Sequence, residues 1–557
     1  MSMPITTNPS SLTTRSATHT GKLASACGRV TNWPVPSLIE WAFLAIGLFL
    51  VIRYLWILDD SFIYFRYVDN HIFLDRGLVF NEGEFVEGYS SPLWLMLLIV
   101  LRQSHLDFWS ITAVIACVGF CVFWYACVVI NNRFCSEDSG VSLNFPLIFL
   151  STAYGVTSYF SSGSESPLVQ LAAALVGLYS LFPQSRRAQI ALGFLPLVRN
   201  EFVVPLFVLV ILTWVLVRRV PWTLIGSSLV CGLSWAIFRI AYYAEFFPTP
   251  FYLKDKVAIA QGFYYLKNCF EPYGFHWILF VALAATLVLR KRGETNLHLR
   301  TRCLMIVVAA SSLPYVIKMG GDMMHYRLLA FPFCLAILSM GGLVERCFHS
   351  LRLVSSRWGR AAVSLTLGVI FLVHYPWFLS SHPLLGHEER TLDHGISDAP
   401  WHRYHPALEF KRSRWLEDHL RIQRYRIASG NQDHVLTEPF CATMYNQLER
   451  QFVHAYGLTD PILARMDVPE ERPAHKPGLF GPARELAWIR SRYRSTRLGL
   501  ATRAISDGVA PHWMVRNEVK IRMIEQRMYN SHSFLNNFVI SLDRIGLIAA
   551  EQPERRR

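Results

Sequence analysis

Long apolar runs are the feature of this 557-residue chain that most limits how it can fold. Such runs recur through the first two thirds of the sequence, and a helix of about 20 apolar residues crosses the ~30 Å hydrocarbon core of a bilayer. Only 17% of the residues are charged, whereas soluble domains carry about 25%. The sequence therefore predicts a polytopic α-helical membrane protein and excludes a disordered chain or an ordinary soluble enzyme.

Hydropathy predicts about eleven transmembrane helices. We expect them near residues 37–58, 109–131, 143–160, 167–183, 188–199, 201–217, 221–243, 276–290, 302–318, 328–345 and 361–380. The apolar stretch Pro92–Leu101 is too short to cross a bilayer and predicts a re-entrant or interfacial helix. Residues 1–36, rich in Ser and Thr, predict a disordered cytoplasmic tail.

Basic residues at the ends of the predicted spans set the expected orientation. They gather in Arg186-Arg187, Arg218-Arg219 and Arg290-Lys291-Arg292. Because cytoplasmic loops are enriched in Lys and Arg, we expect these loops and the N-terminus to lie in the cytoplasm. The net charge of +14 thus follows the topology, and no basic stripe of the kind that binds nucleic acid is present.

An odd number of spans places residues 381–557 on the outer side. They hold no further apolar run and are numerous enough for one domain. We expect a periplasmic, mixed α/β domain with a helix at Ala407–Arg421, which engages a glycan and takes no part in the chemistry. Its candidate sugar-stacking side chains are Trp401, Trp415, Trp488 and Trp513. The alternative, which the apolar rings of Trp favour for any single one of them, is a place in the domain's own core.

The densest polar stretch follows the first predicted span. Asp59 and Asp60 are adjacent carboxylates, an arrangement that raises one pKa and suits a general base or a bound cation. Helical spacing puts Asp59, Arg66 and Asn70 on one side of the next helix. The structural alternative is an Asp that caps an interfacial helix. Further candidates in the outer loop 59–108 are Tyr67, Asn81, Glu84, Glu87 and Tyr89.

Other polar residues interrupt apolar segments later in the chain. Asp322, His325 and Arg327 follow two glycines that allow a tight turn, and Arg and His suit an anionic phosphate. The alternative is a hairpin turn with a snorkelling Arg. Further candidates are Lys254 in an aromatic outer loop, Glu165 before a span, and Arg199 and Glu201 between two spans, where a charge facing lipid costs at least ~2.5 kcal/mol.

Several common catalytic motifs are absent from the sequence. It contains no phosphate-binding Walker loop, dinucleotide fingerprint, HExxH zinc motif or GxSxG elbow. ATP hydrolysis, redox and serine-hydrolase chemistry are therefore not supported. The 11 cysteines and 19 histidines show no metal-ligand spacing, and a divalent cation is conceivable only at the carboxylates.

Together these motifs resemble the GT-C superfamily of polytopic glycosyltransferases, and more narrowly the mycobacterial terminal β-(1→2) arabinofuranosyltransferases. The resemblance covers about residues 40–380. It rests on Asp59-Asp60-x-Phe62-Ile63-x-x-Arg66-Tyr67, Gly77-x-Val79-Phe80-Asn81-x-Gly83-Glu84-x-Val86-Glu87-Gly88-Tyr89, Ser162-Gly163-x-Glu165-x-Pro167-Leu168, Gly320-Gly321-Asp322-x-Met324-x-x-Arg327, and more weakly Gly457-Leu-Thr-Asp460-Pro461-x-Leu-Ala-Arg465. The chain departs from the family at Asn200, where Pro is common, and at Ser90-Ser91, where Thr-Asn is common.

The resemblance implies a bacterial cell-membrane enzyme with a GT-C-like domain at 37–380. It implies transfer of arabinofuranose from a polyprenyl-phosphate donor to a hydroxyl of an extracytoplasmic glycan. Asp59 or Asp60 would deprotonate the acceptor. The implied donor-phosphate ligands are Arg66, Lys254, His325 and Arg327.

Three alternatives remain open at this point. The departures leave the sugar and acceptor undecided, so a mannosyl or other sugar-phosphate-polyprenol transferase fits as well. A transporter also uses broken helices and intramembrane charges, although it usually shows corresponding breaks in two halves. A non-catalytic glycan-binding protein on the same scaffold is the third alternative, and the retained acidic pair Asp59-Asp60 argues against it.

Overall fold

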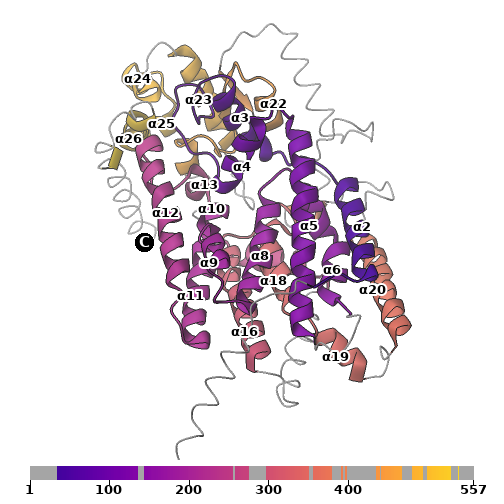
Figure 1. Cartoon of the computed structure of the whole chain (residues 1–557). Coiled ribbons are helices and arrows are strands. Elements are labelled where there is room, and N and C mark those ends of the chain that lie inside the picture. Colours follow the sequence, from indigo (N-terminus) through magenta and orange to yellow (C-terminus); the bar gives the residue numbers. More distant parts are fainter. Residues whose placement is uncertain are drawn as a thin grey trace, which may run out of the picture.

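The protein is described here by a computed structural model, shown in Figure 1. The structure describes residues 34–135, 143–254, 257–271, 273–274, 296–350, 356–378, 391–392, 396–397, 435–438, 441–466, 479–493, 499–528 and 537–538. It is predominantly helical. One layer is a bundle of long helices, and a second layer of short helices covers one end of it (Figure 1).

The bundle contains most of the apolar helices. They are α2 (Leu38–Arg53), α5 (Phe108–Phe134), α6 (Phe145–Thr152), α7 (Tyr154–Phe160), α8 (Ser166–Leu181), α9 (Arg186–Leu192), α10 (Leu195–Val198), η1 (Asn200–Phe202), α11 (Val203–Val217), α12 (Trp222–Tyr243), α16 (Asn296–Ser311), α17 (Leu313–Lys318), η2 (Arg327–Leu329), α18 (Ala330–Leu338), α19 (Leu343–Ser350) and α20 (Arg357–Phe378).

The covering layer combines loops of the first half with the C-terminal part of the chain. Its elements from the first half include α3 (Ser61–Ile72), α4 (Pro92–Arg102) and α13 (Thr249–Leu253), and α14 (Ile259–Phe270) packs against α17. The described C-terminal elements are β1 (Thr391–Leu392), β2 (Ile396–Ser397), β3 (Val435–Glu438), α22 (Cys441–Tyr445), β4 (Gln451–His454), η5 (Leu463–Arg465), α23 (Phe480–Arg492), α24 (Leu500–Ser506), α25 (His512–Arg516) and α26 (Glu518–Met528). We call residues 441–528 the C-terminal region.

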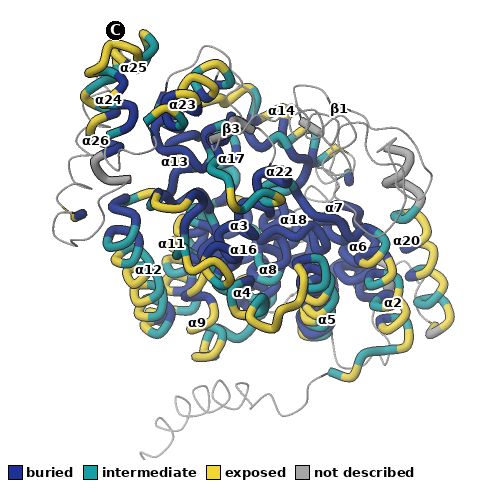
Figure 2. The backbone as a smooth tube through the Cα atoms, turned by 90° about the horizontal axis from the view of Figure 1, so that it is seen from above, coloured by how far each residue is buried: buried dark blue, intermediate teal, exposed yellow. Residues whose placement is uncertain are grey.

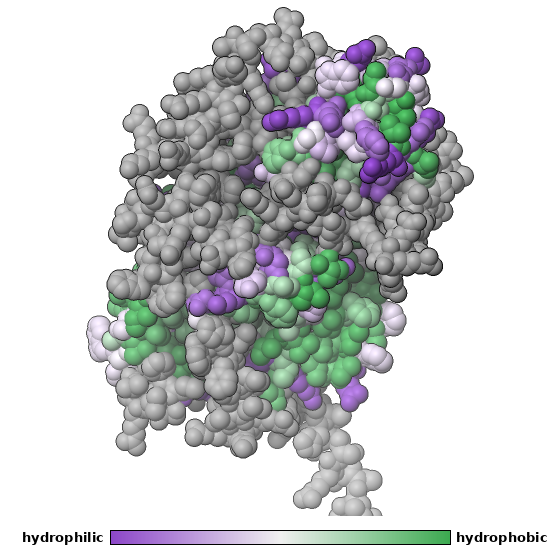
Figure 3. All heavy atoms as spheres, turned by 180° about the vertical axis from the view of Figure 1, so that it is seen from behind, coloured by the Kyte–Doolittle hydropathy of each residue, from purple (hydrophilic) through white to green (hydrophobic). Residues whose placement is uncertain are grey.

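Within the described residues, five helical segments are long and apolar enough to span a membrane: Phe108–Phe134, Asn200–Val217, Trp222–Tyr243, Leu297–Lys318 and Arg327–Arg346. They differ greatly in exposure, because 94% of the apolar window in Arg327–Arg346 is buried but only 17% of that in Trp222–Tyr243. Figure 2 shows exposed residues along the outer sides of α12, α5, α2 and α20, and Figure 3 shows that apolar residues gather on the lower part of the face seen from behind. The protein thus has the character of a membrane protein.

Several predicted spans differ from the helices observed. The expected 143–160 segment is broken at the extended residue Ala153, between α6 and α7. The expected 188–199 segment consists of the short helices α9 and α10. The 276–290 segment lies outside the described residues, so the number eleven stays a prediction. The predicted short helix at Pro92 is α4, whose 11 residues are too few to span a bilayer.

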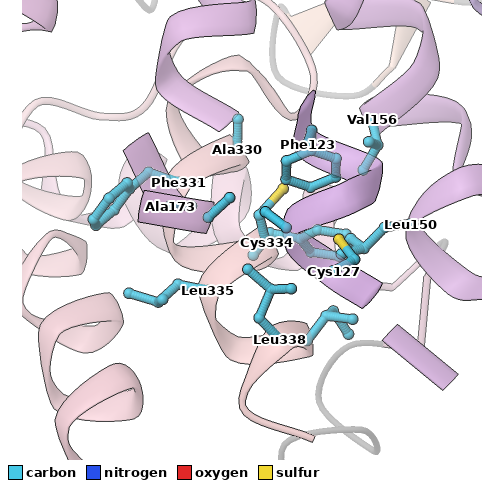
Figure 4. Close-up of a cluster of buried hydrophobic side chains, with 14 of the residues drawn as sticks. Phe123, Cys127, Leu150, Val156, Ala173, Ala330, Phe331, Cys334, Leu335 and Leu338 are labelled. Carbon is cyan, nitrogen blue, oxygen red and sulfur yellow. The ribbon is translucent and has the colours of Figure 1, made fainter. Parts of the chain in front are cut away.

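The main core lies where α5, α8 and α18 meet (Figure 4). Phe123 and Cys127 of α5 face Cys334 and Leu338 of α18, and all four are buried. Gly177 of α8 allows a close approach of the helices, because a Cβ there would lie 2.8 Å from the Ile130 side chain. Close packing of small residues stabilises helix contacts in lipid, where burial from water does not.

The described part of the chain after α20 contains strands as well as helices. β3 and β4 pair in parallel, with Val435 opposite Gln451, and β1 and β2 form a separate antiparallel pair. Helices α23, α24 and α26 share a second buried cluster that also contains Leu253 of α13. The α/β domain expected at residues 381–557 stays a prediction, because much of this range lies outside the described residues. The predicted helix Ala407–Arg421 lies outside the described residues.

Candidate active site

Six of the candidate residues meet at the boundary between the bundle and its covering layer. The acid–arginine cluster, as we call it, consists of Asp60, Glu165, Arg199, Glu201, Asp322 and Arg327. Arg327 Nη1 lies 2.8 Å from Asp60 Oδ2 and 3.7 Å from Asp322 Oδ2. Glu165 Oε1 lies 2.8 Å from Arg199 Nη1 and 3.5 Å from Arg327 Nη2, so it bridges the two guanidinium groups.

Each member of the cluster stands where a helix begins, ends or is interrupted. Asp60 directly precedes α3, and Glu165 directly precedes α8, which has Pro167 in its first turn. Arg199 has extended backbone between α10 and η1. These chain breaks explain why polar side chains appear in otherwise apolar segments: helix ends carry backbone groups that need polar surroundings.

The turn that carries Arg327 is held in an unusual conformation. Gly320 and Gly321 have φ of 80° and 77°, and a Cβ at Gly321 would lie 2.2 Å from the Tyr265 ring. Tyr326, which is not a glycine, also has a positive φ of 69° and is buried. Such strain requires support from the surrounding packing and gathers at functional sites. The predicted tight turn is therefore confirmed.

The charges in the cluster compensate one another only in part. Two arginines stand among four carboxylates, so the formal charge of the cluster is negative. Burial by itself would raise the pKa of Glu165, but Arg327 and Arg199 outweigh it and lower that pKa. Glu165 is thus held as a carboxylate. Among the described residues, Arg327 Nε is a buried donor without a hydrogen-bond partner, which costs free energy until an acceptor arrives.

A pocket lies beside Arg199 and Arg327. Its polar wall also includes Glu201, Ser312 and Tyr315, and its apolar wall is formed by Val169, Phe202, Val204, Val316 and Leu328. Val204 is 50% exposed and Phe207, one turn further along α11, is 64% exposed. The pocket therefore connects the buried Arg199 and the nearly buried Arg327 with the apolar outer surface of Asn200–Val217, a helical segment long enough to span a membrane.

Asp59 is turned toward the C-terminal region instead of the cluster. Its Oδ2 accepts the backbone N–H of Cys441 (3.1 Å) and its Oδ1 that of Ala442 (3.2 Å). Burial raises the pKa of Asp59 to about 6, with a further contribution from Asp60, although the two amide donors oppose the rise. A carboxylate with a pKa close to neutral pH suits general-base chemistry.

Arg66, a predicted phosphate ligand, is occupied by protein groups. Its guanidinium donates to the carbonyl oxygens of Phe80 (2.7 Å), Met444, Gln447 (3.2 Å) and Arg450. Burial lowers its pKa to about 9, so it stays protonated at neutral pH. The structure does not bring Arg66 to the cluster, because the following turn of α3 carries it under the C-terminal region.

Asn81 and Glu84 also face the C-terminal region. The Asn81 amide donates to the Phe452 carbonyl (2.8 Å) and its side-chain oxygen accepts the Phe452 N–H (2.9 Å). Glu84 lies 3.5 Å from Arg490, which also pairs with Asp460 at 2.9 Å. Asn81 therefore holds a segment that lies 371 residues further along the chain, and Glu84 contacts a helix that lies still further on.

Tyr67, Glu87 and Tyr89 support the loop between α3 and α4. The Tyr67 hydroxyl donates to Val86 O and accepts the N–H of Gly88 at 2.9 Å. Glu87 pairs with Arg239 of α12. The Tyr89 hydroxyl lies 3.0 Å from the hydroxyl of Tyr243, which belongs to the same helix α12. These contacts stabilise the loop, and none of them is with the cluster.

The remaining two predicted phosphate ligands are likewise not in the cluster. His325 is buried, with its ring nitrogens 3.0 Å from Asn268 Oδ1 and 3.3 Å from the Tyr273 hydroxyl. Burial lowers the pKa of His325 to about 4, so it is neutral at pH 7 and offers no positive charge. Lys254 directly follows α13, and among the described residues it forms no ion pair with a carboxylate of the cluster.

Similarity to known proteins adds an independent observation. A terminal β-(1→2)-arabinofuranosyltransferase of Mycobacterium tuberculosis is 28% identical over 332 residues, which cover 50% of this chain and 51% of that protein. A protein of the same name from Corynebacterium glutamicum is 26% identical over 375 residues, covering 56% and 52%. The chain is a distant relative of arabinofuranosyltransferases. It spans about half the length of the curated relatives it matches, and no family model or solved structure matches it.

Sequence reasoning missed two kinds of site residue. Ser312 and Tyr315 line the pocket, but both lie within an apolar segment and carry no motif. Cys441 and Ala442 contact Asp59 through backbone amides, which no residue type reveals. Within the described residues, no group of three or more His, Cys, Asp or Glu side chains is arranged to hold a metal ion.

Proposed function

We propose that the protein is a membrane glycosyltransferase that moves an arabinofuranosyl unit from a polyprenyl-phosphate donor to a hydroxyl of an extracytoplasmic glycan. The observation that carries the proposal is the pocket that joins Arg199 and Arg327 to exposed apolar surface on α11. A phosphate on a long hydrocarbon chain combines the same two chemistries. The distant similarity to two arabinofuranosyltransferases supports the choice of sugar.

In this proposal the donor phosphate lies against Arg327. Its unpartnered Nε–H supplies a donor for a phosphate oxygen, and Arg199 adds a second cation across Glu165. Asp60 and Glu165 keep the Arg327 side chain in place. The polyprenyl chain leaves along the exposed face of α11, where Val204 and Phe207 lie. The buried guanidinium groups then stabilise the charge that develops on the leaving phosphate.

Asp59 is the proposed base. The acceptor hydroxyl gives its proton to the Asp59 carboxylate, and its oxygen forms a bond to the anomeric carbon of the sugar. The bond from that carbon to the phosphate oxygen breaks, and the electron pair leaves with the polyprenyl phosphate. A pKa near 6 makes Asp59 mostly ionised at pH 7 while keeping it basic enough to accept the proton.

The test uses the full-length protein in lipid nanodiscs. A synthetic polyprenyl-phospho-arabinofuranose and the matching mannose donor are each offered with a short arabinofuranoside acceptor, and products are identified by mass spectrometry. We expect arabinofuranosyl transfer, and a strong loss in Arg327→Gln but not in Arg503→Gln, an exposed arginine of α24. If only mannose were transferred, the proposed sugar, arabinofuranose, would be wrong. Flux of a sugar or ion across the membrane without a product would favour a transporter.

A further inference from the structure

The first polar motif holds one short segment of the C-terminal region at both of its ends. Asp59 accepts the amides of Cys441 and Ala442, where α22 begins. Arg66, seven residues later, donates to the carbonyls of Met444, Gln447 and Arg450, at the end of α22 and just beyond it. Two residues of one motif therefore bind opposite ends of the segment 441–450.

Aromatic packing seats the same segment on α3. The Tyr445 ring lies among Phe62, Phe65 and Phe108, with ring centroids 5.6 to 6.0 Å apart. The Tyr445 hydroxyl donates to Asp69 Oδ2 at 2.7 Å. Because the aromatic rings exclude water and the hydroxyl is satisfied, the position of α22 on α3 is fixed.

A series of hydrogen bonds through His454 and Cys441 reaches Asp59 from the same region. The Leu458 N–H donates to His454 Nδ1 at 3.4 Å, which leaves the ring proton on Nε2. His454 Nε2 lies 3.4 Å from Cys441 Sγ, and the Cys441 thiol hydrogen-bonds Asp59. In this arrangement the imidazole donates to the sulfur and the thiol donates to the carboxylate.

We propose that the segment 441–454 of the C-terminal region positions the base of the reaction, with Arg66 as the positioning residue that holds this segment against Asp59. The inference rests on the proposed function for the role of Asp59. It also changes the expected division of labour: the C-terminal region builds part of the catalytic centre in addition to any contact with the acceptor.

The hydrogen bonds from the segment 441–454 affect the pKa of Asp59. Each donor from the segment stabilises the ionised form of Asp59 and lowers its pKa against the effect of burial. Loosening the segment therefore raises the pKa of Asp59. The ionisable groups around Asp59 are Asp60 in its own loop, Cys441 of α22, His454 of β4 behind the thiol, and Arg327 of η2 beyond Asp60.

The experiment measures Asp59 directly in the purified full-length protein. A carbodiimide modifies protonated carboxyl groups. The extent to which Asp59 is labelled is therefore measured by mass spectrometry at a series of pH values. The midpoint of this curve is the pH at which half of Asp59 is protonated, and it is obtained without any assay of transfer. Arg66→Gln removes both the positive charge and the several N–H donors of the guanidinium group. Arg66→Lys keeps the positive charge but not the geometry of these donors. We expect the midpoint to rise by about one pH unit in Arg66→Gln. Arg503→Gln, in the same region but exposed, is the control.

Kinetics with a small acceptor separate positioning from folding. In Arg66→Gln we expect kcat to fall several-fold at pH 6 and to recover at higher pH, with the donor KM unchanged, because the pocket is intact. If Arg66→Gln does not fold, Cys441→Ala and Cys441→Ser carry the test. Removing the thiol donor raises the midpoint of Asp59, and the Ser hydroxyl restores it.

The outcomes distinguish the two proposals. An Asp59 midpoint that is the same in the wild type, in folded Arg66 variants and in Cys441→Ala overturns the positioning role. A shifted midpoint in a protein that transfers no arabinofuranose leaves the positioning role standing and overturns the proposed sugar chemistry.

Discussion

Arg327 Nη1 and Asp60 Oδ2 lie 2.8 Å apart although 267 residues separate them in the chain. One belongs to the loop after α2 and the other to the turn before α18. Both are polar interruptions of apolar sequence, and their contact joins the first and the last parts of the bundle at the candidate active site. The pair is therefore the natural starting point for mutagenesis.

We predict that neutralising either member of this pair strongly slows transfer. Asp60→Asn should lower kcat by about 10²–10⁴-fold, because Arg327 loses the carboxylate that orients it. Expression and detergent stability should be measured alongside. Near-native turnover in both Asp60→Asn and Asp59→Asn would show that neither carboxylate serves the reaction.

The pH dependence of transfer should follow Asp59. The ionised carboxylate is the active form, and burial raises its pKa to about 6. Turnover should therefore fall as the pH is lowered through about 6 and should level off above about 7. The measurement is kcat from pH 5 to 8 with saturating donor. If kcat of a partly active Asp59→Asn variant still falls in the same way at low pH, the group that titrates is not Asp59.

His325 should make the protein less stable in mild acid. Burial lowers its pKa from 6.5 to about 4, so the unfolded chain binds more protons than the folded one between these values. Stability due to neutral His325 is complete above about pH 6.5 and is lost progressively toward pH 4, with a total of about 3 kcal/mol. Thermal unfolding in detergent checks this. His325→Asn should flatten the dependence, and an equally steep loss in that variant would contradict it.

Glu165→Gln should destabilise the protein more than any surface exchange. Glu165 is 1% exposed and bridges Arg199 and Arg327, so its loss leaves two buried cations without their common partner. Removing one member of a buried pair costs about 3–5 kcal/mol. Asp507→Asn, which breaks the exposed pair with Arg503, should cost less than about 1 kcal/mol. Thermal unfolding midpoints of the two variants provide the comparison.

The proposed orientation in the membrane has its own test. A cytoplasmic N-terminus and a periplasmic C-terminal region follow from the basic loops around Arg186, Arg218 and Arg290. A reporter enzyme that is active only in the periplasm should be active when fused after Arg557. Activity of a cytoplasmic reporter at the same position would reverse the orientation and remove the argument for a lipid-linked donor.

The sequence singles out the members of the acid–arginine cluster for a physical reason. Glu165, Arg199 and Arg327 interrupt apolar segments, and charges at such places are costly unless they pair or serve a site. The sequence marks each of them as a separate candidate, but it reveals neither that they meet nor the distances between them. Individual helices such as α5 and α12 also follow directly from hydropathy. Breaks such as Ala153 escape hydropathy, because an extended residue among apolar neighbours leaves the pattern unchanged.

The roles of Arg66, Asn81 and Glu84 could not be predicted in the same way. Helical spacing places Arg66 on one face of α3, but it does not reveal what covers that face. The covering segment lies 378 residues away and contributes backbone carbonyls, which every sequence contains. Trp488, a candidate for sugar stacking, is 51% exposed beside Arg492. Trp401 and Trp415 lie outside the described residues.

The pairing of Asn81 with Phe452 bears on the order in which the protein folds. The Asn81 side chain supplies one donor and one acceptor to the backbone of β4, as a neighbouring strand would. β4 thus lacks a complete set of partners until a loop synthesised 371 residues earlier is in place. Contacts over such separations form slowly, and unpaired strand edges invite association between chains. The last part of the chain can then fold without associating with other chains only if the first helices have already inserted correctly.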